Sequence, residues 1–166
     1  GRLQKWFFTN VGQRPVNRTS ASAGQDALNT AVEVLNDGDL FGIYPEGTRS
    51  PDGRLYKGKT GVARIALASG AQVIPVAMIG TRDVNPIGTW FPRPGKVRVK
   101  VGDPIYPIEF VNNRGLERDS YEAIRALTDH IMHQLQQLSG QEYADVYAAE
   151  VKKALAEGGD SSPHNP

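Results

Sequence analysis

The sequence predicts an α/β fold in which a mixed sheet is flanked by helices. Apolar runs of strand length alternate with longer stretches whose apolar residues recur every three to four positions. The predicted order is helix, strand, helix, strand, loop, strand, helix, helix, which is typical of an α/β sheet. The 166 residues suffice for one domain with its own core. We therefore expect one domain over residues 1–157 and a disordered tail, polar in composition, over residues 158–166.

Composition excludes several kinds of function. The net charge is +1, so no general role in binding nucleic acid is predicted. The absence of Cys excludes disulfides, thiolate catalysis and Cys-ligated zinc, and fits a reducing compartment. No apolar run approaches the length of a membrane span, and no signal peptide is recognised. His130 and His133 could share a metal, but two histidines on a helix surface are the simpler interpretation, and we predict no metal site.

The first forty residues predict one extended segment and one helix. The aromatic start of the chain at Gly1 resembles the middle of a longer sequence, so we expect an upstream part to be absent. Residues 11–18 are predicted to be an edge strand, and Arg14 and Arg18 could hold a phosphate or be two solvated surface arginines. Apolar residues between 27 and 35 then fall on one face of a helix that begins near residue 22.

The most informative stretch is the segment Tyr-Pro-Glu-Gly-Thr-Arg-Ser at residues 44–50. It follows the apolar run 40–43, which predicts a short buried strand. Pro45 ends that strand because it lacks an amide hydrogen, and Gly47 permits a tight turn. Glu46 and Arg49 are then presented at the carboxyl end of a strand, where ligands bind in open α/β sheets. An ordinary loop with a solvated Glu and Arg is the alternative.

A helix is predicted to follow Lys57-Gly58-Lys59 and to end at Gly70. The amides at its start would form an anion site next to Lys57 and Lys59. The run 73–79 is nearly all apolar, which predicts a strand covered on both faces. Pro75 within it argues for a strand edge, a bulge or a local break.

The second half of the chain predicts a loop, a strand and two helices. Residues 81–94 are a long loop rich in Pro, Gly and aromatic residues. Residues 97–101 alternate valine with basic residues, which predicts a half-buried strand with one wet, basic face. A long helix should then end at Gly140, and an Ala-rich helix should cover residues 143–156.

Residues 53–60 match the P-loop pattern of nucleotide triphosphatases letter for letter. A genuine P-loop has its first Gly directly after a buried strand, whereas here residues 45–52 intervene. The next apolar strand also lacks a terminal Asp for magnesium. A nucleotide-binding function is therefore kept only as a minor alternative.

Taken together, these segments resemble the 1-acylglycerol-3-phosphate acyltransferase family of glycerolipid synthesis. The segment 44–50 resembles that family's Phe-Pro-Glu-Gly-Thr-Arg-Ser block, with Tyr44 in place of Phe. Residues 11–18 resemble the preceding block, which ends in Arg, and residues 73–76 resemble an apolar block with an internal Pro. Lys57-Gly58 matches a basic residue and Gly that follow the central block. The resemblance covers roughly residues 1–147.

The resemblance implies a glycerolipid-acyltransferase-like fold, incomplete at the N-terminus, and a role for several residues. By the resemblance, Arg18 and Arg49 would bind the acceptor phosphate with help from Lys57. Gly47 and Thr48 belong to the same phosphate-binding block. Glu46 would orient the acceptor glycerol or the arginines, and Pro75 would shape the acyl-chain side.

One part of the family pattern is missing, because no His in this sequence is followed by an Asp five positions later. In the family that His is the general base and the Asp orients it, so no catalytic residue is predicted within this chain. The implied reaction moves an acyl group from acyl-CoA or acyl carrier protein to the hydroxyl of lysophosphatidate, without a cofactor. We expect a cytoplasmic protein at the membrane surface, and a chain that is inactive or nearly so by itself. The alternative from another class is a non-catalytic module that binds phosphate or lipid head groups.

Overall fold

The computed structural model describes residues 23–86, 89 and 91–158. The chain divides into two compact units, Gly1–Phe41 and Gly42–Pro166. In the first unit the described element is α2 (Ala23–Asn36), which confirms the predicted helix. It ends where Gly38 adopts φ +86°, with the Gly38 N–H donating to the Leu35 carbonyl at 3.1 Å. The predicted edge strand 11–18, with Arg14 and Arg18, lies outside the described residues, as does the tail from residue 159.

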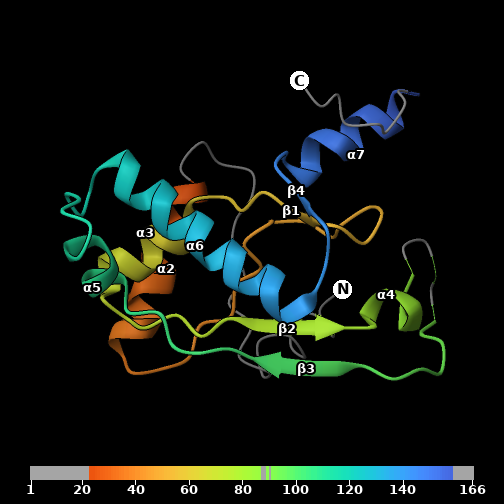
Figure 1. The fold of residues 1–166 in the computed structure, drawn as a ribbon, viewed down its shortest axis with the longest axis horizontal. Coiled ribbons are helices and arrows are strands. Elements are labelled where there is room, and N and C mark those ends of the chain that lie inside the picture. The colour runs from red at the N-terminus through yellow and green to blue at the C-terminus, as the bar shows by residue number, and fades with distance from the viewer. Residues whose placement is uncertain (1–22, 87–88, 90, 159–166) are drawn as a thin grey trace. The chain divides into compact units, whose positions relative to one another are not determined.

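The described part of the second unit contains five helices and four short strands (Figure 1). They run in the order β1 (Leu55–Tyr56), α3 (Gly61–Ser69), β2 (Val76–Ile79), α4 (Thr81–Val84), β3 (Arg98–Val101), α5 (Pro107–Asn112), α6 (Tyr121–Ser139), β4 (Tyr143–Ala144) and α7 (Ala148–Ala156). β1 pairs in parallel with β4, and β2 pairs antiparallel with β3. The mixed α/β class with flanking helices is confirmed, although these strands form two small sheets.

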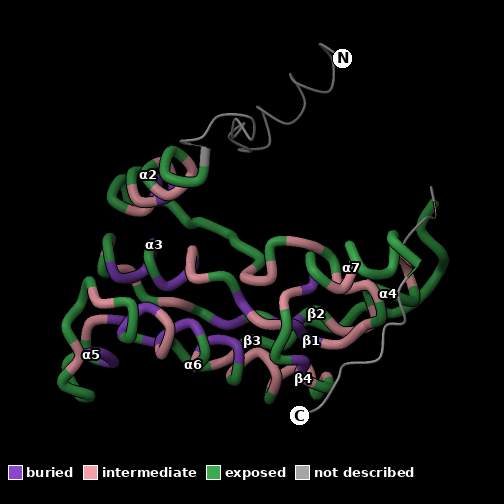
Figure 2. Tube along the Cα trace, turned by 90° about the horizontal axis from the view of Figure 1, so that it is seen from above, coloured by how far each residue is buried: buried purple, intermediate pink, exposed green. Residues whose placement is uncertain are grey.

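The core of the second unit lies among α3, α5 and α6 (Figure 2). The predicted apolar stripe of α6 is confirmed, because Ile124, Leu127 and Ile131 are buried. Ser120 caps this helix by accepting a hydrogen bond from the Ala123 N–H at 3.1 Å, and Gly140 ends it. None of the described helices combines the length and the apolar character needed to cross a membrane.

The prediction of a buried strand at residues 40–43 is wrong. These residues form no strand, and Leu40 is 98 % exposed. A strand is stable only when neighbouring strands accept and donate its backbone hydrogen bonds. The described part of the chain pairs no strand with this segment, so its apolar composition alone does not make it a strand.

Within the described residues, β2 is covered on one face only, which contradicts the predicted two-sided burial. Pro75 interrupts the segment as expected, because the isolated bridge between Val73 and Ile105 lies before it and β2 begins after it. Ala77 is 6 % exposed on the face that meets α6, whereas Val76 and Met78 are nearly half exposed. A strand with one covered face usually alternates apolar and polar residues, and this run lacks that alternation.

β3 also differs from its prediction. The valines were expected to face the core and the basic residues to face water, yet all four residues of β3 are exposed. The register pairs Val76 with Val101 and Met78 with Val99, so the valines share the open face of β2. α6 contacts both strands of this sheet and packs on the opposite face, where Ala77 is buried.

Three helices differ from the sequence-based prediction. The predicted helix 143–156 begins only at α7, because residues 143–144 pair with β1 instead. α5 was not predicted, although Pro107 at its first turn is a standard start signal. A single helical turn, α4, lies within the expected loop 81–94.

The close contact of Gly58 with α6 leads to the first prediction. A Cβ at Gly58 would lie 2.8 Å from the Cγ and Sδ atoms of the buried Met132. We expect Gly58→Ala to lower the free energy of unfolding by about 1–3 kcal/mol through overpacking. Urea unfolding monitored by circular dichroism measures this. Gly42→Ala is the matched control, since no atom lies within 4 Å of that position; equal effects of the two substitutions would refute the packing argument.

Candidate functional site

The segment 44–50 forms a tight loop whose shape requires glycine. The Gly47 N–H donates to the Tyr44 carbonyl at 3.0 Å, and Gly47 adopts φ +70°. The side chain of Lys59 lies directly over Gly47, since a Cβ there would be 3.2 Å from the Lys59 Cδ. The Lys59 N–H also donates to the Pro45 carbonyl at 2.8 Å, which ties the loop to the segment before α3.

Glu46 holds this loop against β1. Its carboxylate accepts a hydrogen bond from the Tyr56 N–H at 2.9 Å, and Tyr56 is fully buried. Burial raises the pKa of Glu46, the Tyr56 N–H opposes that rise, Asp52 adds to it and Lys152 opposes it. The structure therefore gives Glu46 a positioning contact within the protein, whereas its expected contact with the acceptor or the arginines stays a prediction.

Asp52 organises the turn that follows the loop. It accepts hydrogen bonds from the Arg54 N–H at 3.0 Å, the Arg54 Nε at 2.7 Å and the Tyr56 hydroxyl at 2.8 Å. Burial acts to raise the pKa of Asp52, but these hydrogen bonds outweigh it and lower the pKa to about 2. Asp52 and Glu46 are thus both committed to the internal structure of the loop region.

The cations around the loop differ in what they contact. Arg49 is exposed, and within the described part of the chain its guanidinium has no hydrogen bond or ion pair. Lys57, expected to assist phosphate binding, forms an ion pair with Asp145 at 2.9 Å, which raises the pKa of Lys57. Lys59 instead lies over Gly47. The Lys152 Nζ donates to the Thr48 hydroxyl at 2.7 Å, a contact that sequence analysis missed because 104 residues separate the two.

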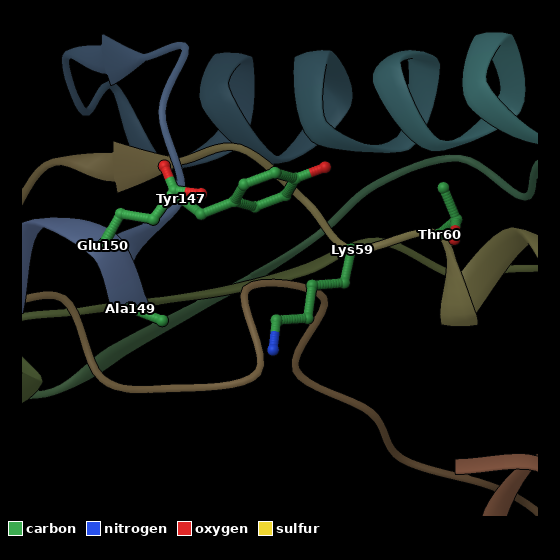
Figure 3. A pocket seen from close by; sticks show the side chains of 5 residues that line it. All are labelled: Lys59, Thr60, Tyr147, Ala149 and Glu150. Carbon is green, nitrogen blue, oxygen red and sulfur yellow. The ribbon is translucent and has the colours of Figure 1, made fainter.

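An open hollow of about 400 Å³ lies beside these residues (Figure 3). It is lined by Lys59, Thr60, Tyr147, Ala149 and Glu150. Thr60 is the N-cap of α3 and makes no side-chain capping bond, so it does not satisfy the helix's first amides. Figure 3 shows the Lys59 ammonium pointing away from the Glu150 carboxylate. The hollow therefore lies between the start of α3, the Lys59 side chain and the start of α7.

Of the remaining predicted site residues, Arg18 lies outside the described residues. Pro75 is buried, and its carbonyl accepts a hydrogen bond from the Gly102 N–H at 2.9 Å. That contact places it at the junction of β2 and β3, and its role on the acyl side stays a prediction.

The P-loop pattern at residues 53–60 does not form a phosphate cradle. β1 lies within the pattern, whereas a P-loop needs its strand before the first Gly. Its amides are also occupied, as those of Gly53, Arg54 and Leu55 donate to Ser50, Asp52 and Glu142. The amides of Tyr56, Lys57 and Lys59 likewise donate within the protein.

Comparison with known proteins finds similarity to acyltransferases. A family model described as Acyltransferase matches residues 1–79. A chloroplastic 1-acyl-sn-glycerol-3-phosphate acyltransferase of Brassica napus is 35 % identical over 102 residues, or 61 % of this chain and 30 % of that protein. The crystal structure of the 1-acyl-sn-glycerophosphate acyltransferase PlsC of Thermotoga maritima matches with a TM-score of 0.61 and 31 % identity. Over the matched residues, this chain is similar to 1-acyl-sn-glycerol-3-phosphate acyltransferases.

The match covers part of each relative. The structural match covers 81 % of this chain and 51 % of the Thermotoga acyltransferase. A Bacillus subtilis 1-acyl-sn-glycerol-3-phosphate acyltransferase is 27 % identical over 81 % of this chain and 62 % of that protein. Within this chain, the loop 44–50 and the cations beside it form the candidate site.

The buried Tyr56 amide leads to a prediction about Glu46. We expect Glu46→Ala to lower the free energy of unfolding by about 1–3 kcal/mol, because a buried N–H loses its acceptor. Glu46→Gln keeps an acceptor oxygen and avoids burying a charge, so it should stay within about 1 kcal/mol of the original chain. Urea unfolding at pH 7 distinguishes the two. A Gln variant as unstable as the Ala variant would show that the charge matters and the acceptor does not.

The depressed pKa of Asp52 predicts a specific acid sensitivity. The folded-state pKa of about 2 lies below the usual 3.8, so the ionised carboxylate stabilises the fold at pH values above 4. That stability should be lost as the pH falls from about 4 to about 2. Thermal unfolding of the chain and of Asp52→Asn across this range measures it. The difference between them should shrink as the pH falls, and a constant difference would contradict the assignment.

Proposed function

We propose that this chain supplies the acceptor-phosphate site of a 1-acylglycerol-3-phosphate acyltransferase. The observation that carries the proposal is the exposed Arg49, unpaired within the described residues, on a loop whose two nearby carboxylates have internal partners. A guanidinium binds a phosphate through two parallel hydrogen bonds. The Lys59 side chain lies over Gly47 of this loop, and Thr60 at the start of α3 lines the adjoining hollow. An anion is favoured at such a helix start.

The reaction would transfer an acyl group from acyl-CoA or acyl carrier protein to lysophosphatidate. The free hydroxyl attacks the thioester carbonyl, the carbon–sulfur bond breaks, and the thiol takes up the proton that the hydroxyl loses. This chain's own residues would hold the phosphate and so place the hydroxyl at a fixed distance from the phosphate site. Because the acceptor carries an acyl chain, we propose that the enzyme works at a membrane surface.

The sequence contains no His followed five positions later by Asp, which is the general-base pattern of the family. We therefore propose that this chain alone transfers acyl groups very slowly or not at all, since loss of a general base costs about 10²–10⁴ in rate. The same absence favours the second candidate, a module that binds phosphate or lipid head groups without catalysis. An acyl-transfer assay on this chain beside the complete product of its gene separates the two. Activity of the complete product alone supports the enzyme, and activity of neither supports the binding module.

The unpaired guanidinium leads to a prediction about ligand affinity. Arg49→Ala should weaken binding of glycerol 3-phosphate to the chain about 10- to 100-fold, as expected for the loss of a charge-assisted contact. Titration calorimetry measures the change. Arg98→Ala on β3 is the control, because it removes one exposed arginine from the other sheet and leaves the net charge equal. Equal weakening by both substitutions would reduce the effect to general charge and overturn the site.

A further inference from the structure

The contact between Lys152 and Thr48 brings α7 to the phosphate loop. The two residues lie 104 positions apart, and the Lys152 Nζ donates to the Thr48 Oγ1 at 2.7 Å. Within the described residues, the side chain of Lys152 therefore links α7 to the segment 44–50 by a direct hydrogen bond. The position of Lys152 beside the loop therefore depends on how α7 is held in place.

A small apolar cluster anchors α7 on β1. Ala148 is 1 % exposed and packs with Tyr56 and Ala144, and Val151 packs against the same cluster. Ala148 and Lys152 are four residues apart, so they lie on one face of the helix. Tyr56 also donates its N–H to Glu46. The same buried residue thus positions both the loop and the helix that carries Lys152.

The charge of Lys152 is not neutralised by an ion pair. Within the described residues, Lys57 pairs with Asp145 at 2.9 Å and Lys153 pairs with Glu157 at 3.9 Å. Lys152 forms no ion pair within 4.0 Å among these residues, and its charge interacts with the Glu46 carboxylate only over a longer distance. Its hydrogen-bond partner is a neutral hydroxyl. An ammonium has three N–H donors, so Lys152 can keep Thr48 and still donate to a ligand. Thr48 accepts from Lys152, which leaves its own proton to donate elsewhere.

We propose that Lys152 is a binding residue for the acceptor phosphate, and that α7 completes the site formed by Arg49 and Lys59. The inference rests on the proposed function of the loop. Arg49 would hold two phosphate oxygens, while Lys59 and Lys152 would add charge from the other sides of the loop. The Glu150 carboxylate lines the adjoining hollow but is directed away from the Lys59 ammonium, and no ion pair joins the two (Figure 3).

The chemistry selects a class of acceptor. Three cations around one loop match the nearly double negative charge of a phosphate monoester near pH 7. A phosphate diester, as in a lysophospholipid with an esterified head group, carries one charge and offers fewer acceptor oxygens. Lys152 should therefore increase the preference for a monoester over a diester.

The test compares Lys152→Met with Lys153→Met. Both substitutions remove one positive charge from adjacent positions of α7, and methionine keeps most of the apolar stem. We expect Lys152→Met to weaken binding of glycerol 3-phosphate to the chain about 5- to 50-fold, with Lys153→Met within about twofold of the original. Lys152→Arg should recover most of the affinity. In the complete gene product, Lys152→Met should raise KM for lysophosphatidate and leave kcat nearly unchanged.

The outcomes distinguish the two proposals. If the original chain binds no glycerol 3-phosphate, the proposed function fails and this inference fails with it. If the chain binds and Arg49→Ala weakens binding, but Lys152→Met binds as tightly as Lys153→Met, only this inference is overturned. Circular dichroism of each variant shows whether α7 is retained. A Lys152→Met chain that loses helix yet keeps its affinity also overturns the inference, because the site then does not need α7.

Discussion

The hydrogen bond from the Tyr56 N–H to the Glu46 carboxylate connects the loop to the rest of the second unit. Tyr56 is fully buried, lies in β1 and packs against Ala144 and Ala148. Its hydroxyl donates to Asp52, so the same residue also orders the following turn. The loop, the turn, β4 and α7 therefore share one buried anchor, and the position of the exposed cations depends on it.

In this arrangement the acidic side chains of the loop region have partners within the protein, whereas Arg49 is exposed. The chain as a whole has a net charge of only +1, so a basic site cannot come from composition. Instead, Glu46 and Asp52 direct their oxygens at backbone N–H groups and at neighbouring side chains. Arg49 remains exposed with no ion pair among the described residues. A local positive region thus results from committing the nearby acids to the fold, which links the loop's stability to its electrostatics.

Sequence reasoning worked where local physics decides the outcome. α2, α3 and α6 followed from helical periodicity and from glycines at their ends, and the break at Pro75 followed from its missing amide hydrogen. It failed where distant partners decide. The apolar run 40–43 predicts a strand, but a strand needs a neighbouring strand to pair with. Residues 143–144 were predicted to be helical, but they pair with β1 as a strand. Within the site, the loop was found from its motif, whereas Lys152 could not be, because a contact across 104 residues leaves no local pattern.

The parallel pairing of β1 with β4 has a consequence for how the site is made. Next to this pair, the Gln141 Nε2 donates a hydrogen bond to the Gly53 carbonyl. The two residues lie 88 positions apart, so bringing them together carries an entropic cost. Contacts of such long sequence separation form slowly. During synthesis the loop 44–50 emerges from the ribosome well before β4 and α7 exist. The site is therefore assembled only after α7 has been synthesised, and an early stop that removes α7 leaves the motif intact but without its final geometry.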